Sequence, residues 1–234
     1  NDEAKICAMK GEQYCPDWTL IWAKSQTAGR GRRGRVWESL DGNLFASIIL
    51  RPKLPAQEAL QISYIASIAV HETTVKHCSS GDSVLCKWPN DILLNNKKIS
   101  GILLESSGIE NGLLDWLVIG LGVNICKAPN NTSYPTTSFH NEGILNITRE
   151  DFLLSFSRSF LKWHNIWSTD GFAYIRDIWL KRAKGINSQI RILTNNRIIS
   201  GIFVGINNEG SLLLKNDALS HKYHVVSAGD IYFS

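Results

Sequence analysis

Arginine and glycine alternate in one short stretch of the chain. Residues 25–37 read Ser-Gln-Thr-Ala-Gly-Arg-Gly-Arg-Arg-Gly-Arg-Val-Trp. Glycine lets a backbone take positive φ angles and come close to a ligand. Arginine brings a permanent charge and a planar fork of donors that fits phosphate and carboxylate oxygens. This Arg-Gly loop therefore suits either a cradle for an anionic small molecule or a solvated basic segment. Trp37 at its end could stack on a base.

The spacing of Gly29, Gly31 and Gly34 matches the GxGxxG pattern of dinucleotide-binding folds, but its context does not. That fold needs a helix directly after the glycines and an acidic residue about twenty positions further on. Here an Asp-Gly turn and a strand follow, and residues 51–54 read Arg-Pro-Lys-Leu. The sequence also lacks the Gly-Lys-Ser/Thr run of a P-loop, so both nucleotide folds are excluded.

A second cluster begins with Lys-Trp-Pro-Asn-Asp over residues 87–91. Its proline breaks a strand, so Asn90 and Asp91 sit where the chain turns back. Asp91 could hold a magnesium ion or orient an arginine. Lys98 starts the next strand and could meet a carboxylate or phosphate as a point charge. A plain hairpin with solvated lysines explains the same pattern.

A third cluster, Ile-Gly-Leu-Gly-Val-Asn over residues 119–124, puts two glycines into an apolar strand. Such glycines indicate a bulge or the close approach of a ligand. Asn124 has the donor and acceptor needed to read an adenine edge. The six histidines form no convincing metal set, because their pairs lack a third ligand.

The composition fits an ordinary globular protein of 234 residues, 44% apolar and 20% charged. The net charge of +4 is compatible with acidic partners but does not demand nucleic acid. No run is long enough to span a membrane and no signal peptide is visible. The five cysteines have no CxxC spacing, which argues against a disulfide framework and makes a reducing cytoplasm the simplest setting.

Hydrophobic periodicity predicts the elements of a main domain, residues 1–184. Helices are expected over residues 1–13, 56–77, 148–167 and 172–184, and strands over residues 18–24, 44–51, 84–88, 92–94, 99–105 and 116–125. On the longest helix, Leu60, Tyr64, Ile68 and Val75 recur at helical spacing and predict its apolar stripe.

A small second domain is predicted over residues 185–234, because the sequence after Gly185 changes to short apolar segments separated by turn residues. Five short strands alternate there with Asn, Gly and Asp turns, at residues 189–193, 197–206, 211–214, 223–226 and 231–233. This pattern predicts a small β-barrel.

In this order, the three clusters resemble the catalytic domain of the biotin protein ligases. The matching segments are residues 26–35 with Trp37, residues 87–91, Lys-Ile-Ser-Gly at 98–101 and Gly-Leu-Gly-Val-Asn at 120–124. The resemblance implies an α+β fold, with a class II aminoacyl-tRNA-synthetase-like mixed sheet and helices, followed by a C-terminal SH3-like β-barrel. Nothing here resembles the N-terminal DNA-binding domain of the repressor members, so a monofunctional form is expected.

The resemblance implies an ATP-dependent ligase that forms biotinyl-5′-AMP and transfers biotin to a lysine of a biotin carboxyl carrier protein. It implies ATP and Mg²⁺ as cofactors, biotin as substrate, and the carrier domain of acetyl-CoA carboxylase or a related enzyme as partner. It implies a cytoplasmic protein without DNA or membrane partners, and it is compatible with a homodimer.

Site residues are carried over by motif match. Lys98, Arg32 and Arg30 would be catalytic; biotin would contact Asn1, Gln26, Arg30, Gly31, Arg32, Lys98 and Gly101; ATP would contact Arg32, Arg35, Trp37, Lys87, Asn90, Asp91, Lys98 and Asn124. Asp91 is the candidate metal ligand. The Ser/Thr-Asn segment that precedes the family's first helix is represented only by Asn1, so the hydroxyl side chains expected at biotin's ureido ring are missing from the sequence.

Two alternatives remain open at this point. A lipoate–protein ligase shares the fold and the adenylation chemistry, but the Arg-Gly loop and the Lys-Trp-Pro-Asn-Asp cluster together favour biotin. An RNA-binding module without enzymatic activity could use the Arg-Gly loop and aromatic residues. It lacks an interleaved aromatic platform and leaves residues 87–101 unexplained.

Overall fold

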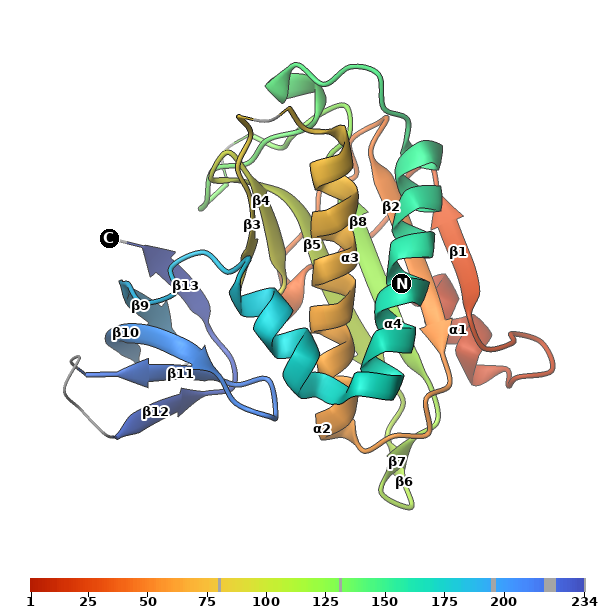
Figure 1. Ribbon diagram of the computed structural model, residues 1–234. Coiled ribbons are helices and arrows are strands. Elements are labelled where there is room, and N and C mark those ends of the chain that lie inside the picture. The colour runs from red at the N-terminus through yellow and green to blue at the C-terminus, as the bar shows by residue number, and fades with distance from the viewer. Residues whose placement is uncertain (80, 131, 195–196, 217–221, 234) are drawn as a thin grey trace.

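The computed structural model describes residues 1–79, 81–130, 132–194, 197–216 and 222–233. Its larger sheet has six strands in the order β1-β2-β8-β5-β4-β3 (Figure 1). All neighbouring strands in this sheet are antiparallel, and parallel pairing enters only as the isolated bridges Lys98–Thr136 and Cys86–Ala183 among the described residues. The strands are β1 (Thr19–Ala23), β2 (Leu44–Leu50), β8 (Leu117–Val123), β5 (Lys97–Ser106), β4 (Asp91–Leu94) and β3 (Val84–Lys87).

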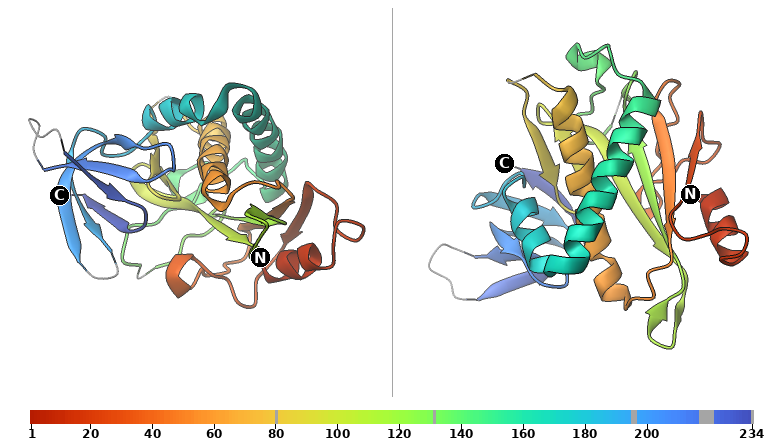
Figure 2. Two further views of the ribbon diagram at one scale, coloured as in Figure 1. Left: turned by 90° about the horizontal axis from the view of Figure 1, so that it is seen from below. Right: turned by 45° about the vertical axis from the view of Figure 1, so that its right-hand side comes forward.

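Helices α3 (Gln61–His77) and α4 (Arg149–Leu180) lie side by side across one face of this sheet (Figures 1 and 2). Helix α1 (Asp2–Met9) packs on the opposite face, where Ala4 and Ala8 meet Ile49 and Val118. The Arg-Gly loop lies on this second face as well (Figure 2). The sheet therefore buries its core beneath the two long helices and leaves part of its other face for a site.

The predicted helix over residues 56–77 is divided in the structure into α2 (Ala56–Ala59) and α3. Half of its predicted apolar stripe is wrong, because Leu60 is 53% exposed and Val75 47% exposed, while Tyr64 and Ile68 are buried. Helix α3 packs against both the sheet and α4, so it is buried on more than one side. Its buried residues therefore do not follow a single stripe.

Two predicted helix boundaries differ from the structure. Helix α1 ends at Met9, before Gly11 at a φ of 95°, although the sequence predicted a helix to residue 13. The two predicted helices 148–167 and 172–184 form one element, α4, with a break at Gly171, where φ is 76°. Thr148 caps its start, since the Thr148 hydroxyl accepts a hydrogen bond from the backbone N–H of Asp151 at 3.1 Å.

All five predicted C-terminal strands are present and form an antiparallel sheet in the order β12-β11-β10-β9-β13, consistent with an SH3-like domain (Figure 1). They are β9 (Gln189–Leu193), β10 (Ile198–Ile206), β11 (Leu212–Lys215), β12 (Tyr223–Val226) and β13 (Asp230–Phe233). A short hairpin, β6 (Ile109–Glu110) and β7 (Leu113–Leu114), was not predicted. We propose keeping the division at residues 184 and 185, because the two sheets are separate and residue 184 lies between α4 and β9.

No helix in the described part of the chain is long and apolar enough to cross a membrane. All five cysteines are free thiols.

One carboxylate joins the two long helices. Glu72 of α3 accepts hydrogen bonds from Ser159 at 3.0 Å, from Lys162 at 2.9 Å and from the indole N–H of Trp163, all on α4. Burial by itself raises the pKa of Glu72, but these three donors outweigh it and lower the pKa to about 2.

We predict that Glu72→Gln lowers the free energy of unfolding by about 1–3 kcal/mol at neutral pH, because three donors lose a charged acceptor. Urea unfolding measures this, with Glu12→Gln, an exposed carboxylate, as the control. Because the pKa of Glu72 is lower in the folded protein than its ordinary value of 4.5, its carboxylate stabilises the fold fully at a pH above 4.5. This stabilisation is lost as the pH falls from 4.5 through about 2. The difference between wild type and variant should shrink over that range; a constant difference would contradict the assignment.

Candidate active site

Three glycines form the floor of the site on the sheet face opposite α3 and α4. Gly101 on β5 pairs with Gly122 on β8, and Gly120 lies two residues before Gly122 on the same strand. A Cβ atom at Gly122 would lie 2.5 Å from the Trp37 ring, and one at Gly120 would lie 2.3 Å from the Asn1 side chain. The glycines are therefore required for Trp37 and Asn1 to lie directly on the sheet.

The Arg-Gly loop folds back on itself as a short hairpin. Gly31 N–H donates to the carbonyl of Arg35 at 2.7 Å, and Trp37 N–H donates to the carbonyl of Gly29 at 3.0 Å. Its tip turns through Arg33 and Gly34, whose φ angles are 55° and 73°. Gly34 suits this left-handed conformation, whereas Arg33 adopts it with some strain.

Ion pairs hold the loop at both ends. The Arg30 guanidinium forms a bidentate ion pair with Asp2 of α1, with hydrogen bonds of 2.6 and 2.5 Å, and a longer one of 3.4 Å to Glu105. At the other end, Arg35 pairs with Asp230 of β13, and Arg33 lies 3.5 Å from the same carboxylate. The hydrogen bonds from Arg30 and Lys5 lower the pKa of Asp2 well below its usual range. The loop is thus fastened to α1 and to the C-terminal sheet.

Lys98 and Asp91 face each other across the β4–β5 hairpin, with 2.6 Å between the Lys98 ammonium and Asp91 Oδ1. The Lys98 side chain runs back over Gly101, and its Nζ lies 5.4 Å from the centre of the Trp37 ring. Any side chain at Gly101 would push against both. Lys98 therefore presents a cation to the cavity between the glycine floor and the loop.

Two further cations line this cavity without a carboxylate at ion-pair distance among the described residues. Lys87, at the end of β3, is 7% exposed, and Arg32 is half-buried. Among the described residues, the Arg32 guanidinium has one hydrogen bond, a long one of 3.4 Å to Asn90. Burial lowers the pKa of Arg32 and lowers that of Lys87 to about 8. Positive charge held in this way is suited to an anionic ligand.

The structure brings all predicted site residues to one cavity of about 270 Å³. They are Asn1, Gln26, Arg30, Gly31, Arg32, Arg35, Trp37, Lys87, Asn90, Asp91, Lys98, Gly101 and Asn124. Residues from the N-terminus, the Arg-Gly loop, β3, β4, β5 and β8 meet here. The role of each of these residues remains a proposal.

In two of these residues the polar side-chain groups are already bound to other groups of the protein. Arg30 is engaged by Asp2 and Glu105, so its catalytic role stays a prediction, while its contacts anchor the loop. Asn124 is 2% exposed; its amide donates to the carbonyl of Thr137 at 2.9 Å and accepts from Asn43 at 3.4 Å. Its expected contact with adenine likewise stays a prediction.

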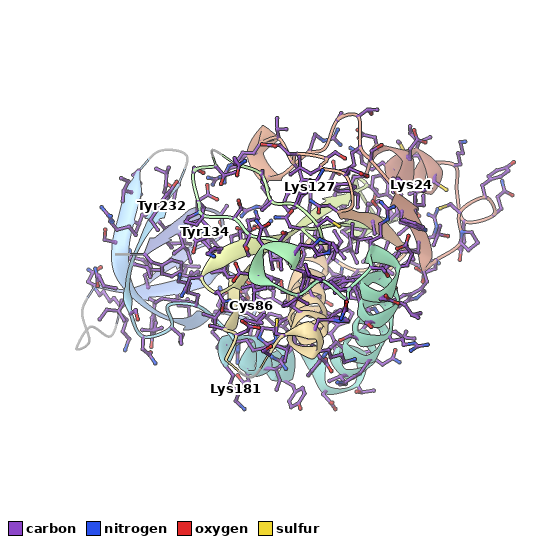
Figure 3. All side chains as sticks on the ribbon, turned by 90° about the horizontal axis from the view of Figure 1, so that it is seen from above. Lys24, Cys86, Lys127, Tyr134, Lys181 and Tyr232 are labelled. Atoms are coloured by element: carbon purple, nitrogen blue, oxygen red, sulfur yellow. The ribbon has the colours of Figure 1, made fainter. Side chains whose placement is uncertain are left out.

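Sequence reasoning missed several residues of the cavity wall. Asp2 and Asp230, which anchor the loop, lie outside the three clusters, and so do Tyr134 and Tyr232. Figure 3 shows both tyrosines on the side where the two sheets meet. Tyr134 lies between the strand predicted over residues 116–125 and the helix predicted over residues 148–167, where the sequence predicted neither helix nor strand. The Tyr-Pro-Thr-Thr-Ser run at residues 134–138 was the available signal, since a proline there fixes the backbone.

No group of three or more His, Cys, Asp or Glu side chains that could hold a metal occurs within the described ranges. Asp91 brings one carboxylate to the cavity. Mg²⁺ is usually held by one or two carboxylates together with substrate phosphates, so this donor set fits Mg²⁺ bound with a nucleotide.

Comparison with known proteins agrees with the fold and the cavity. The sequence model of the Biotin/lipoate A/B protein ligase family matches residues 12–124, and that of the Biotin protein ligase C terminal domain matches residues 185–234. A biotin–acetyl-CoA-carboxylase ligase of Paracoccus denitrificans is 37% identical over 92% of this chain and 90% of its own. The bifunctional ligase/repressor BirA of Bacillus subtilis is 36% identical over 86% of this chain, which spans 63% of that longer protein.

The solved structure of the biotin protein ligase from Aquifex aeolicus in complex with biotin and ATP has the same fold, with a TM-score of 0.77. It shares 24% sequence identity and is aligned over 97% of this chain and 93% of its own. The sequence matches thus place the chain in the class to which biotin and lipoate ligases belong, and its fold agrees with them. Within that class, the chain belongs to the biotin protein ligase family.

We predict that Asp230→Asn loosens the Arg-Gly loop. Partly exposed ion pairs contribute about 0.2–1 kcal/mol, so loop cleavage by trypsin should become about two- to fivefold faster. Mass spectrometry of the fragments identifies cleavage after Arg33 and Arg35. Asp115→Asn, which removes a carboxylate near Arg51 and far from the loop, is the control. Equal cleavage of wild type and Asp230→Asn would show that Asp230 does not restrain the loop.

Proposed function

We propose that this chain is an ATP-dependent ligase that activates biotin as biotinyl-5′-AMP and transfers it to a lysine of a biotin carboxyl carrier protein. The observation that carries the proposal is the meeting of Lys98, Lys87 and Arg32 in one cavity above the glycine floor. Similarity to a biotin–acetyl-CoA-carboxylase ligase supports the reaction, and a related fold has been solved with biotin and ATP.

In the first step, a biotin carboxylate oxygen attacks the α-phosphorus of ATP, and the bond to pyrophosphate breaks. Both reactants are anions, so the chain must hold them together against their repulsion. In this proposal Lys98 bridges the carboxylate and the α-phosphate, and the Asp91 carboxylate, 2.6 Å from the Lys98 ammonium, orients it. Lys87 and Arg32 are suited to the phosphate oxygens, because neither has a carboxylate at ion-pair distance in the described part of the chain.

In the second step, the neutral amine of a carrier lysine attacks the acyl carbon of biotinyl-5′-AMP. An amide bond forms, AMP leaves, and the amine loses a proton. The mixed anhydride must be protected from water between the steps. The Arg-Gly loop covers the cavity from the side opposite the glycine floor, and its two ion-paired ends suit it to close over the intermediate.

The partner in this proposal is the carrier domain of acetyl-CoA carboxylase or of a related biotin enzyme, and Mg²⁺ would be held by Asp91 and the phosphates. The five free thiols support the cytoplasm as the setting. The match to the biotin protein ligase C-terminal domain favours biotin over lipoate. A homodimer stays a prediction.

Mass spectrometry of an isolated carrier domain, incubated with the protein, biotin and Mg-ATP, tests this function. We expect the carrier to gain one biotinyl group on a single lysine. Samples without ATP, and samples with lipoate in place of biotin, are the controls. Transfer of lipoate but not biotin, or no transfer at all, would contradict the proposal.

We predict that Lys98→Ala slows biotinyl-adenylate formation by about 10²–10³-fold, because it removes a main charge stabiliser of the transition state. Biotin-dependent exchange of labelled pyrophosphate into ATP measures this step. The neighbouring Lys97 is the matched control, since it is 47% exposed and pairs with Glu142 instead. Lys97→Ala should retain the wild-type rate within about twofold. Near-wild-type exchange by Lys98→Ala would remove Lys98 from the mechanism.

A further inference from the structure

Tyr134 forms a wall of the cavity that none of the three sequence clusters supplies. Its ring lies against the Lys87 ammonium, with 3.6 Å from Nζ to the ring centre. Within the described residues, the Lys87 ammonium has no hydrogen bond and no ion pair, and the Tyr134 ring is the group that lies close to its charge. A cation held over an aromatic face is stabilised by the negative face of the ring, most strongly when water is excluded.

The tyrosine itself is fixed from several directions. Its hydroxyl donates to the carbonyl of Asn96 at 3.3 Å and accepts from the Lys184 ammonium, also at 3.3 Å. The segment that follows is bound to the start of β5, because Lys98 N–H donates to the carbonyl of Pro135 at 2.7 Å. Thr137 N–H donates in turn to the carbonyl of Lys98 at 2.9 Å. The ring therefore keeps a set position beside both active-site lysines.

We propose that Tyr134 is a positioning residue that holds the Lys87 ammonium in place for the pyrophosphate part of the nucleotide. This inference rests on the proposed function, since it assigns Lys87 to ATP. The ring restrains the lysine without neutralising it. A carboxylate in the same place would compete with phosphate for the ammonium, whereas an aromatic face leaves the N–H donors free.

Calorimetric binding of inorganic pyrophosphate, together with the KM for ATP, tests the role. Tyr134→Leu should weaken pyrophosphate binding and raise the KM for ATP by about fivefold to thirtyfold, with kcat much less affected. Tyr134→Phe keeps the ring and should stay within about twofold of wild type. Tyr174→Leu, an exposed tyrosine on α4, is the matched control.

A double-mutant cycle separates positioning from a general structural effect. In a Lys87→Met background, Tyr134→Leu should add no further loss of pyrophosphate affinity. A fluorinated phenylalanine at position 134 keeps the shape of the ring but weakens its negative face, and it should behave like Tyr134→Leu even if that variant folds poorly. Additive losses, an equal defect in Tyr134→Phe, or wild-type protein that does not bind pyrophosphate would overturn the proposal. Failure of the wild type to biotinylate would instead overturn the proposed function, because pyrophosphate binding needs no turnover.

Discussion

The site depends on positive charge that the fold holds out of water without neutralising it. Lys87 is almost fully buried, and its nearest charge partner is an aromatic face. Arg32 is half-buried and makes one long hydrogen bond to an amide. Unpaired cations in such places are unfavourable on their own, so the rest of the structure must impose them. Strand β3 ends and β4 begins at the cavity. Lys87, the last residue of β3, is therefore held at the cavity with little room to reach solvent.

The glycine floor is the second constraint. On β8, Ile119, Leu121 and Val123 face the core beneath the helices, while Gly120 and Gly122 face the cavity. Successive residues of a strand face opposite sides of the sheet. On β8, one set of residues therefore packs in the core, while the other set is glycine and leaves the opposite face without side chains. The indole of Trp37 fills part of that space in the structure. Because the ring lies directly on the strand, it is the face of the ring turned away from the strand on which a base or a fused ring can stack.

Local sequence patterns predicted most strands, whereas the meeting of the three clusters was implied only by the resemblance to the biotin protein ligases. Residues 87–101 span the β3–β4 and β4–β5 hairpins, and β5 and β8 are neighbours in register, so the sheet brings the second and third clusters together. The Arg-Gly loop is distant from both in sequence. Helix α3 was less predictable, because burial on several sides removes the single stripe that periodicity detects. Asp230 has no motif around it and Tyr134 has only the Tyr-Pro run, because their roles arise from contacts with Arg35 and Lys87, which are distant in sequence.

These distant contacts make the C-terminal sheet part of the site. Asp230, Ile231 and Tyr232 of β13 line the cavity, and Asp230 holds the tip of the Arg-Gly loop. The same carboxylate acts on Lys87 by raising its pKa against the effect of burial. An anion that binds Arg33 or Arg35 must therefore compete with Asp230, and any movement of β13 changes the field at Lys87. Within the described part of the chain, Asp230 is thus the carboxylate that joins the C-terminal domain to the Arg-Gly loop by ion pairs.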